Sequence, residues 1–424
     1  MKRFILLMVF FVTSYAQAQL TNINITKGID NPTRIAVVPM SYVGPKLPED
    51  ISEIVRNDLN FSGQFESIPV EKMISYPQNE SEIHYRDWKM INAEFLLIGG
   101  ITQQAGRYYA SYELFDVVQQ KRALARITVD GTEAQLRDIA HRISDKAYET
   151  VTGIRGIFST KIIYVEAFQK PAKFRLMLSD VDGARSRSLL ESKQPILSPV
   201  WSPDGTRVAY VSFETDRPAV YVQNLSTGRR DQVTNYKGLN GAPAWSPDGQ
   251  NLAVVLSKDG NPEIYTLNVA SRALTRVTNH FAIDTEPSWT ADGSGIFFTS
   301  DRGVKPQIYK VTLATGQTER VTFDGVYNAR GRVSPDGKSL VMVNRRDDTF
   351  HIAAQELKSG NLRILTETSL DESPTIAPNG AMLMYATSFA GKGILAAVSL
   401  DARTKVRLPS KQGDVREPAW SPFF

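Results

Sequence analysis

The chain has 424 residues, of which 42% are apolar and 22% charged, a composition typical of globular proteins and a length sufficient for two domains. It contains no cysteine, so the fold relies on core packing without disulfides. A formal net charge of only +4 argues against nucleic-acid binding, which usually brings a strong basic excess.

Residues 1–18 predict a removable secretory signal. Lys2 and Arg3 precede an apolar stretch that is too short to remain as a spanning helix, and Ala16-Gln17-Ala18 matches a cleavage site. We therefore expect a mature chain that begins at Gln19 and is soluble in the bacterial periplasm. A retained membrane anchor is the alternative.

Residues 19–156 lack any long repeat and are predicted to form a small mixed α/β domain. Strands are expected at 34–39, 65–68, 94–102, 107–116 and 123–129, and helices at 48–60, 85–91 and 134–150. The connection at 152–156 is short, which favours a restricted hinge over a flexible tether.

From residue 157 to 424 the chain carries an internal repeat with steps of 43 or 44 residues, anchored at Trp201, Trp245, Trp289, Val333, Ile376 and Trp420. Periods of about 40 to 45 residues are typical of β-propellers, in which each repeat is one four-stranded antiparallel sheet. Copies such as Trp201-Ser-Pro-Asp-Gly205 predict a tight turn between the first two strands. The apolar run after each turn predicts a strand that is buried on both faces.

The two ends of the repeat predict six blades in a closed ring. Residues 161–192 have the pattern of strands two to four of a blade, but no turn motif precedes them. Pro418-Ala-Trp-Ser-Pro422 has the first-strand motif, and the chain stops two residues later. Joining these fragments completes one blade, so the fold class predicted for 157–424 is an all-β six-bladed propeller closed by pairing of the last strand with the first.

The sequence lacks the motifs of common enzyme classes. Gly293-Ser294-Gly295 does not have the spacing of a nucleophile elbow, and no P-loop or dinucleotide fingerprint is present. The turn aspartates are expected to be structural rather than calcium ligands, and the repeated tryptophans to be inter-blade core rather than sugar-stacking platforms. The histidines lack the spacing of a zinc motif and are expected to lie at the surface or to bond locally: His84, His141, His280 and His351. We therefore predict no catalytic, metal or cofactor site, although spacing alone does not exclude the paired carboxylates of a glycosidase.

The ordered set of features resembles the TolB family of the Tol-Pal system over essentially the full length. Besides the signal and the terminal motif, it includes Val37-Val38-Pro39, the junction Gly153-Ile-Arg-Gly156, and the ring motifs Asn240-Gly-Ala-Pro243, Thr285-Glu-Pro287 and Asp371-Glu-Ser-Pro374. Single Trp-Ser-Pro-Asp-Gly copies occur in many unrelated propellers, whereas the ordered set is specific. The resemblance implies a monomeric, non-enzymatic periplasmic adaptor that supports outer-membrane integrity and constriction during cell division.

The resemblance also implies that the channel mouth receives Pal, the peptidoglycan-associated lipoprotein, and that certain imported bacteriocins compete for it. Carboxylates and guanidinium groups alternate around this rim, which suits docking of a protein in one orientation. Leu239 stands where many family members have a histidine, so a polar contact is expected to be missing or replaced by an apolar one. The residues implied to bind Pal are Asn240, Gly241, Ala242, Thr285, Glu286, Arg330, Glu372, Arg416 and Glu417.

Residues 19–32 form an N-terminal segment in which apolar and polar residues alternate. Such a segment can lie on its own protein or add as a strand to another sheet. The resemblance implies that it engages TolA, an inner-membrane-anchored protein, through Gln19, Leu20, Ile23 and Ile25. We hypothesise that docked and released states of this segment report whether the propeller mouth is occupied.

Two other functions remain open at this point. One is an exported hydrolase or carbohydrate-binding propeller that uses the channel as its site. The other is a scaffold for further envelope proteins, including other outer-membrane lipoproteins.

Overall fold

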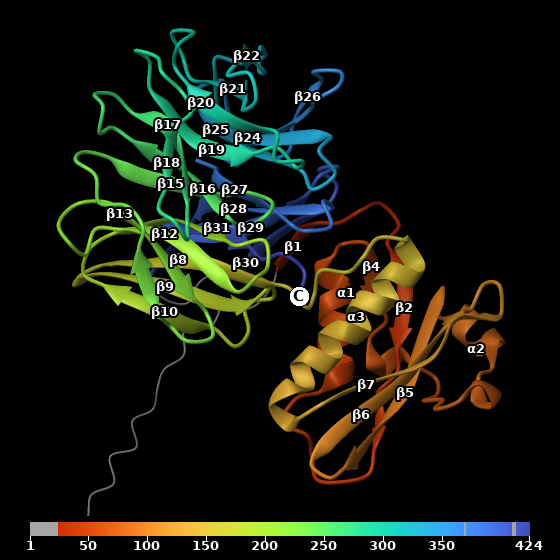
Figure 1. Cartoon of the computed structure of the whole chain (residues 1–424). Coiled ribbons are helices and arrows are strands. Elements are labelled where there is room, and N and C mark those ends of the chain that lie inside the picture. The colour runs from red at the N-terminus through yellow and green to blue at the C-terminus, as the bar shows by residue number, and fades with distance from the viewer. Residues whose placement is uncertain (1–23, 369, 409–412) are drawn as a thin grey trace, which may run out of the picture.

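The computed structural model describes residues 24–368, 370–408 and 413–424 (Figure 1). The predicted signal and cleavage site lie outside the described residues, as do Gln19, Leu20 and Ile23. The described chain forms an N-terminal α/β lobe beside a ring of six antiparallel sheets, which confirms the predicted fold class. Among the described helices, none is both long and apolar enough to cross a membrane.

The α/β lobe is built on one sheet in the order β4-β2-β5-β6-β7, with β3 also pairing with β5. Its strands are β2 (Thr33–Val37), β3 (Ser41–Tyr42), β4 (Phe65–Ser67), β5 (Phe95–Gln104), β6 (Arg107–Asp116) and β7 (Lys121–Gly131). Its helices are α1 (Ile51–Phe61), α2 (Tyr85–Met90) and α3 (Leu136–Thr152), with short 3-10 turns η1 (Val70–Lys72), η2 (Glu80–Glu82) and η3 (Glu133–Gln135). Alternate residues of β2 enter two different cores, so the sheet is buried on both faces.

Every element expected in this lobe is present, and the helix starts differ for a local reason. The helix expected from residue 48 begins at Ile51 because the side chain of Asp50 accepts a hydrogen bond from the Glu53 amide and caps it. The helix expected from residue 134 begins with η3, where Thr132 and Gln135 form a capping box.

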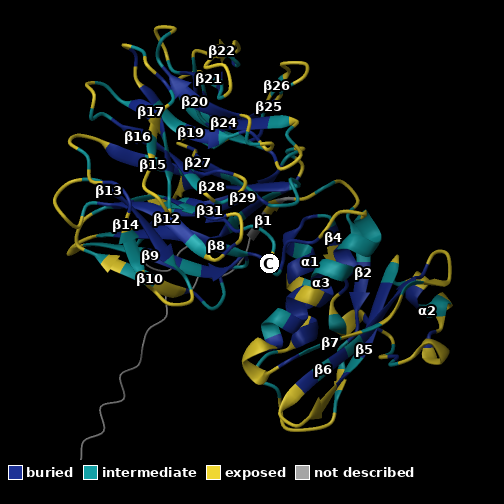
Figure 2. Cartoon of the chain, in the orientation of Figure 1, coloured by how far each residue is buried: buried dark blue, intermediate teal, exposed yellow. Residues whose placement is uncertain are grey.

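The propeller blades are numbered here in chain order, and Figure 2 shows their strands largely buried and the loops at their ends exposed. Blade 1 contains β8 (Lys161–Gln169), β9 (Ala172–Asp180), β10 (Arg187–Ser192) and β31 (Asp414–Trp420); blade 2 contains β11 (Ile196–Trp201), β12 (Arg207–Ser212), β13 (Ala219–Asn224) and β14 (Arg230–Gln232); blade 3 contains β15 (Asn240–Trp245), β16 (Asn251–Leu256), β17 (Glu263–Asn268) and β18 (Leu274–Arg276). Blade 4 contains β19 (Asp284–Trp289), β20 (Gly295–Ser300), β21 (Gln307–Thr312) and β22 (Thr318–Arg320); blade 5 contains β23 (Tyr327–Val333), β24 (Ser339–Arg346), β25 (Thr349–Glu356) and β26 (Leu362–Ile364); blade 6 contains β27 (Glu372–Ile376), β28 (Met382–Phe389), β29 (Lys392–Ser399) and β30 (Lys405–Leu408).

The ring closes as predicted. The last strand, β31, pairs antiparallel with β8, with Trp420 opposite Ile162 and Arg416 opposite Val165. The Trp420 indole donates a hydrogen bond of 2.8 Å to the hydroxyl of Thr160, which fixes the end of the chain against the start of the propeller. No blade is therefore left with an open inner edge at the junction.

The repeated motif makes the predicted turns. In the first copy Gly205 has φ 68°, the left-handed conformation that glycine adopts without strain. The carboxylate of Asp204 accepts from the hydroxyl of Ser202 at 2.5 Å and from the Thr206 amide at 3.0 Å. The turn itself thus uses the aspartate, in agreement with the structural interpretation of this residue.

The N-terminal segment adds as a strand to its own propeller. Strand β1 (Asn24–Lys27) pairs antiparallel with β30 and forms the fifth, outermost strand of blade 6. Ile25 pairs with Val406, and the Thr26 hydroxyl donates to the Lys405 carbonyl at 3.2 Å. The sequence left two arrangements open for this segment, contact with its own protein or addition to another sheet. In the structure the segment pairs with its own propeller.

A cluster of charged residues joins the two lobes, and we call it the interlobe cluster. It comprises Asp58, Arg137, Asp138, His141, Lys161, Asp180, Asp182 and Arg185. At its centre the His141 ring is fully buried; its Nδ1 lies 2.8 Å from Asp58 in α1 and its Nε2 lies 3.6 Å from Asp180 at the end of β9. The expectation of a surface or locally bonded histidine was wrong for His141, because its partners come from distant segments of the chain.

The charges of the interlobe cluster compensate one another. Burial alone would lower the pKa of His141, but the carboxylates of Asp58 and Asp180 outweigh it and raise the pKa to about 10. Burial would raise the pKa of Asp180, but hydrogen bonds from His141 and Arg185 and the charge of Lys161 hold it well below its usual range. Although Asp58, His141 and Asp182 have the spacing of metal ligands, Arg137 pairs with Asp182 and Ser144 donates to Asp58. The arrangement therefore acts as an ionic contact between the lobes.

Apolar packing reinforces this contact. One hydrophobic cluster runs from α3 into blades 1 and 6, and the rings of Tyr148 and Phe158 meet edge to face at 5.7 Å. In the junction, the Asn379 side chain donates to the Arg155 carbonyl at 2.8 Å, and the Arg155 guanidinium lies 3.7 Å from the centre of the Phe423 ring. These contacts agree with the restricted hinge expected from the short connection.

Candidate functional site at the channel mouth

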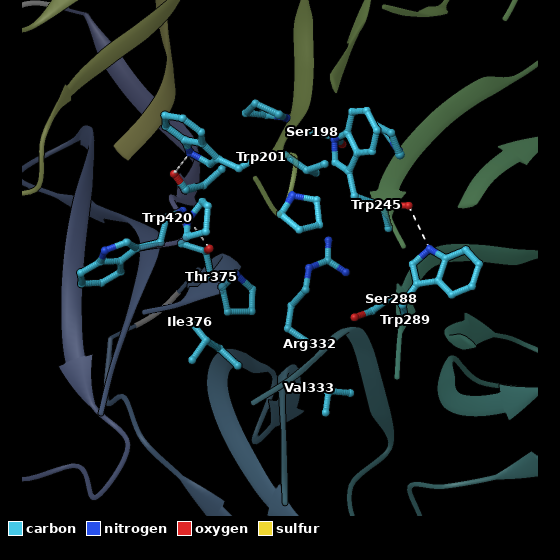
Figure 3. Close-up of a pocket in the computed structure, with 18 of the residues that line it drawn as sticks. Ser198, Trp201, Trp245, Ser288, Trp289, Arg332, Val333, Thr375, Ile376 and Trp420 are labelled. Carbon is cyan, nitrogen blue, oxygen red and sulfur yellow. Dashed lines mark hydrogen bonds between the residues drawn. The ribbon is translucent and has the colours of Figure 1, made fainter. Parts of the chain in front are cut away.

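The first strands of the six blades surround a central channel. A cavity of about 500 Å³ runs along it, from the strand starts to the prolines of the turn motifs. Figure 3 shows Trp201, Trp245, Trp289 and Trp420 around the cavity. Trp201, Trp245 and Trp420 are only 9%, 8% and 5% exposed, so most of each side chain lies in the inter-blade core and a small part contributes to the cavity wall.

A ring of six strained residues, which we call the mouth ring, lines one end of this cavity. Each lies three positions before the blade anchor, where the first strand bulges, and each has a left-handed φ of 45–55° although none is glycine. The residues of the mouth ring are Ser198, Ala242, Glu286, Arg330, Ser373 and Glu417. This conformation costs about 1–2 kcal/mol per residue, and such strain gathers at functional sites.

The local sequence explains the bulge. Five of the six residues precede a proline, which lacks an amide hydrogen and disfavours the right-handed helical conformation in the residue before it. Arg330 instead precedes Gly331, where a Cβ would approach the Leu340 side chain at 3.1 Å. The bulge turns the side chains of the mouth ring toward the channel axis.

Arg330 connects the mouth ring across the channel. Its Nε donates to Glu286 at 2.8 Å, its Nη1 donates to the Ser373 hydroxyl, and Nη1 lies 3.7 Å from Glu417. Burial alone would lower the pKa of Arg330, but the carboxylates of Glu417, Glu286 and Glu372 raise it above its usual value. Side chains from blades 4, 5, 6 and 1 are thus tied into one ionic network.

A second pocket of about 610 Å³ opens beside the ring, over blades 5, 6 and 1. Its lining includes Glu286, Arg330, Glu372 and Arg416, so four of the nine predicted site residues meet in one hollow. Tyr327 and Phe350 form part of the wall and pack edge to face at 5.5 Å. The pocket therefore combines an aromatic surface with charged groups that a partner can pair with.

The structure divides the predicted site residues into four groups. Ala242, Glu286, Arg330 and Glu417 belong to the mouth ring, whereas Glu372 and Arg416 flank it in the pocket. Thr285 is half-buried beside Glu286 in β19.

The remaining two predicted residues, Asn240 and Gly241, are buried. The Asn240 amide donates to the carbonyls of Tyr236 at 2.8 Å and Gly238 at 3.1 Å, so it shapes the loop that precedes the first strand. Its side chain is therefore committed within the propeller and does not face a partner.

Sequence reasoning missed the residues that make the mouth face apolar. Of the large hydrophobic residues exposed on the described propeller, all but Phe424 lie on the mouth face, in its loops or, for Phe389, at the end of a strand. These residues, the apolar rim, are Leu239, Phe281, Ile283, Val304, Phe323, Val326, Leu370 and Phe389. Phe281 is 87% exposed and Phe323 is 70% exposed, a degree of exposure that marks binding surfaces when it is concentrated on one face. Phenylalanine in loops otherwise rich in turn residues was the signal that could have found them.

Comparison with known proteins identifies relatives over both lobes. Residues 21–123 match the family model described as the TolB amino-terminal domain, and residues 148–424 match that of the TolB beta propeller domain. The Tol-Pal system protein TolB of Pseudomonas aeruginosa is 59% identical over 406 residues, which cover 94% of each chain. That of Pseudomonas putida is 56% identical over 428 residues, covering 100% of this chain and 99% of the relative. The crystal structure of TolB from Acinetobacter baumannii superposes with a TM-score of 0.88 at 42% identity, covering 95% of this chain and 99% of that one.

Proposed function

This chain belongs to the TolB family of the Tol-Pal system, and from that membership we propose that it is a non-enzymatic periplasmic adaptor with two partners. It binds the lipoprotein Pal at the channel mouth and TolA through its N-terminal segment. Linking an outer-membrane lipoprotein to an inner-membrane protein in this way supports envelope integrity and constriction during division.

The apolar rim is the observation that carries the Pal-binding proposal. Eight large hydrophobic residues surround a charged centre on one face of an otherwise polar propeller. Protein interfaces combine these two features, because buried aromatic anchors supply most of the binding free energy and charged groups fix the orientation. Leu239, 38% exposed, belongs to this rim, so the position that carries a histidine in many relatives contributes apolar contact here.

Substitution of the rim tests this proposal. Phe281→Ser with Phe323→Ser is expected to weaken Pal binding, measured by calorimetry, by about 2 kcal/mol or more, because both rings lose their buried contact area in the complex. The matched control is Met90→Ser with Val118→Ser, which removes side chains that are 69% and 61% exposed on the α/β lobe. Equal affinity of the rim variant and the control would place the Pal site elsewhere.

The N-terminal segment suits the capture of TolA by strand exchange. Strand β1 has only four residues and pairs with β30 alone, so few hydrogen bonds hold it. Once released, its backbone is free to pair with the edge of another sheet. Deletion of residues 19–30 is expected to abolish TolA capture from an envelope extract and to leave Pal binding unchanged. Loss of both activities would mean that the segment is a folding element.

Blade 6 offers a physical connection between the two sites. Asn24 of β1 pairs with Arg407 of β30, and the Arg407 guanidinium lies 4.3 Å from the ring of Phe389 in the apolar rim. A partner that contacts Phe389 thereby changes the surroundings of the residue opposite β1. We expect Pal to alter hydrogen exchange at the amides of residues 24–27, and exchange that is identical with and without Pal would contradict the coupling.

A further inference from the structure

Inside the channel, below the mouth ring, lies a cation without an acidic partner. Arg332 lines the cavity, and Figure 3 shows its side chain extending between those of the surrounding blades. Its Nη1 donates to the carbonyls of Gly331 at 3.2 Å and Pro287 at 3.4 Å, both long for charged donors. Within the described part of the chain it forms no ion pair, and Nε and Nη2 make no hydrogen bond.

The two acids that line the same cavity are already engaged with Arg330. Glu286 Oε1 accepts from Arg330 Nε at 2.8 Å, and Oε2 accepts from the Arg330 amide at 3.0 Å and from the Thr299 hydroxyl at 2.9 Å. Glu417 faces Nη1 of Arg330. Burial lowers the pKa of Arg332, and Glu286 and Glu417 offset this effect only in part. Arg332 is half-buried in the channel, so its charge is partly desolvated without full compensation, which is unfavourable unless a ligand supplies an anion.

The propeller architecture does not require an arginine here. In the other five blades the position just before the anchor holds an uncharged residue, namely Val200, Ala244, Ser288, Thr375 and Ala419. These blades form the same bulged first strand without any cation. Arg332 is thus a departure from the repeat that adds a charge to the channel and contributes no ion pair to the fold.

The surroundings of Arg332 indicate what kind of anion fits. The wall around it combines tryptophan and proline side chains with the hydroxyl groups of residues such as Ser288 and Thr375, so a ligand meets apolar surface interspersed with polar groups. A volume of about 500 Å³ is within the range of sites for small organic molecules. We propose that the channel binds a carboxylate with an apolar body, whose charged end pairs with Arg332 and whose body contacts the tryptophan and proline wall. This carboxylate belongs to a free small acid or to a side chain of a protein partner.

Titration calorimetry on the purified full chain with sodium benzoate tests the first source. Benzoate is expected to bind saturably, whereas benzamide, which has the same shape and no charge, is not. Arg332→Met is expected to weaken benzoate binding at least about tenfold, because the charged hydrogen bonds are lost. Arg332→Lys should retain part of the affinity, and Arg229→Met, which removes an arginine that is 77% exposed on blade 2, should retain all of it.

Binding of Pal by the same variants tests the second source. If a carboxylate of Pal pairs with Arg332, Arg332→Met should bind Pal more weakly and benzoate should compete with Pal for the wild-type protein. If the natural ligand is a free acid, neither effect is expected. The channel proposal depends on binding by the Arg332 variants, whereas the Pal proposal depends on Pal binding by the rim variants. Failure of one proposal can therefore be distinguished from failure of the other. If Arg332→Met binds both benzoate and Pal as the wild type does, the proposal is overturned.

Thermal unfolding separates a binding role of Arg332 from a structural one. Removal of a half-buried charge that has no ion pair should leave the melting temperature of Arg332→Met unchanged or raise it. A lower melting temperature of Arg332→Met would show that Arg332 serves the fold. Benzoate affinity that is weak and equal in the wild type and the variant would show that no specific anion site exists.

Discussion

The interlobe cluster and the mouth ring are built from the same chemical groups, yet they differ in what surrounds them. In both, carboxylates and cations gather in a buried region, and their pKa values shift in response. The central histidine of the interlobe cluster has no exposed surface, and only its outer members, such as Asp138 and Arg185, reach solvent. The mouth ring borders two cavities, lies next to exposed aromatic side chains and holds six residues in a strained backbone conformation.

This difference indicates which properties set the proposed binding site apart from a structural contact. Shifted pKa values are common to both clusters and identify neither. Backbone strain is concentrated at the mouth ring, with six left-handed residues against Arg185 alone in the interlobe cluster, and it coincides there with cavity volume and exposed apolar side chains. Folding by itself does not favour these three properties, and binding of the proposed partner would give a physical reason to retain them.

The largest effect is expected from breaking the interlobe cluster. His141→Ala should lower the free energy of unfolding by about 3–5 kcal/mol, because Asp58 and Asp180 then lose the cation between them. Urea denaturation measures this change, with His84→Ala, an exposed histidine, as the matched control. The comparison predicts that Pal affinity survives under conditions where the variant remains folded. A loss below about 1 kcal/mol would mean that the cluster does not hold the lobes together.

A pH series should give the next largest effect. His141 has its pKa raised from 6.5 to about 10, so the folded state retains a proton that the unfolded state releases within this window. Its stabilisation is complete below pH 6.5 and is lost as the pH rises toward 10. The stability difference between wild type and His141→Ala, measured by denaturation at each pH, should shrink across this range. A constant difference would refute the assignment of the proton to His141.

A smaller effect, on binding rather than on the fold, is expected at the mouth. Charge reversal by Glu286→Lys together with Thr285→Arg should weaken Pal binding by on the order of 2 kcal/mol, because Arg330 loses its strongest partner and the rim becomes more cationic. Glu319→Lys, on the exposed outer strand of the same blade, is the control. Calorimetry measures the loss of Pal affinity in this variant, and urea denaturation measures its loss of stability. A loss of stability larger than the loss of affinity would mean that the mouth ring is a structural contact as well.

The sequence predicted the features that repeat or are local. The period of 43 or 44 residues fixed the number of blades, and the motif ending in Gly205 fixed the turn between strands one and two. The α/β elements followed from apolar periodicity, with errors of a few residues where caps such as Asp50 set the helix start.

Contacts between distant segments were not predictable in this way. His141 is 83 residues from Asp58 in the chain, and no local pattern joins them. The strain at Glu286 and its equivalents arises from the bulge of the first strand. In the sequence, the proline after Glu286 was the only indication of this bulge. Asn240 was assigned to the binding surface by its motif, whereas its side chain points back into its own loop.

The closure of the propeller has a consequence for the order in which the protein becomes competent. Arg416 and Glu417 belong to β31, the last strand of the chain, which also supplies the missing first strand of blade 1. Until β31 pairs with β8, blade 1 lacks its innermost strand, whereas the other five blades already contain all of theirs. Assembly of the mouth ring is therefore coupled to closure of the propeller, because Glu417 joins the ring only together with β31.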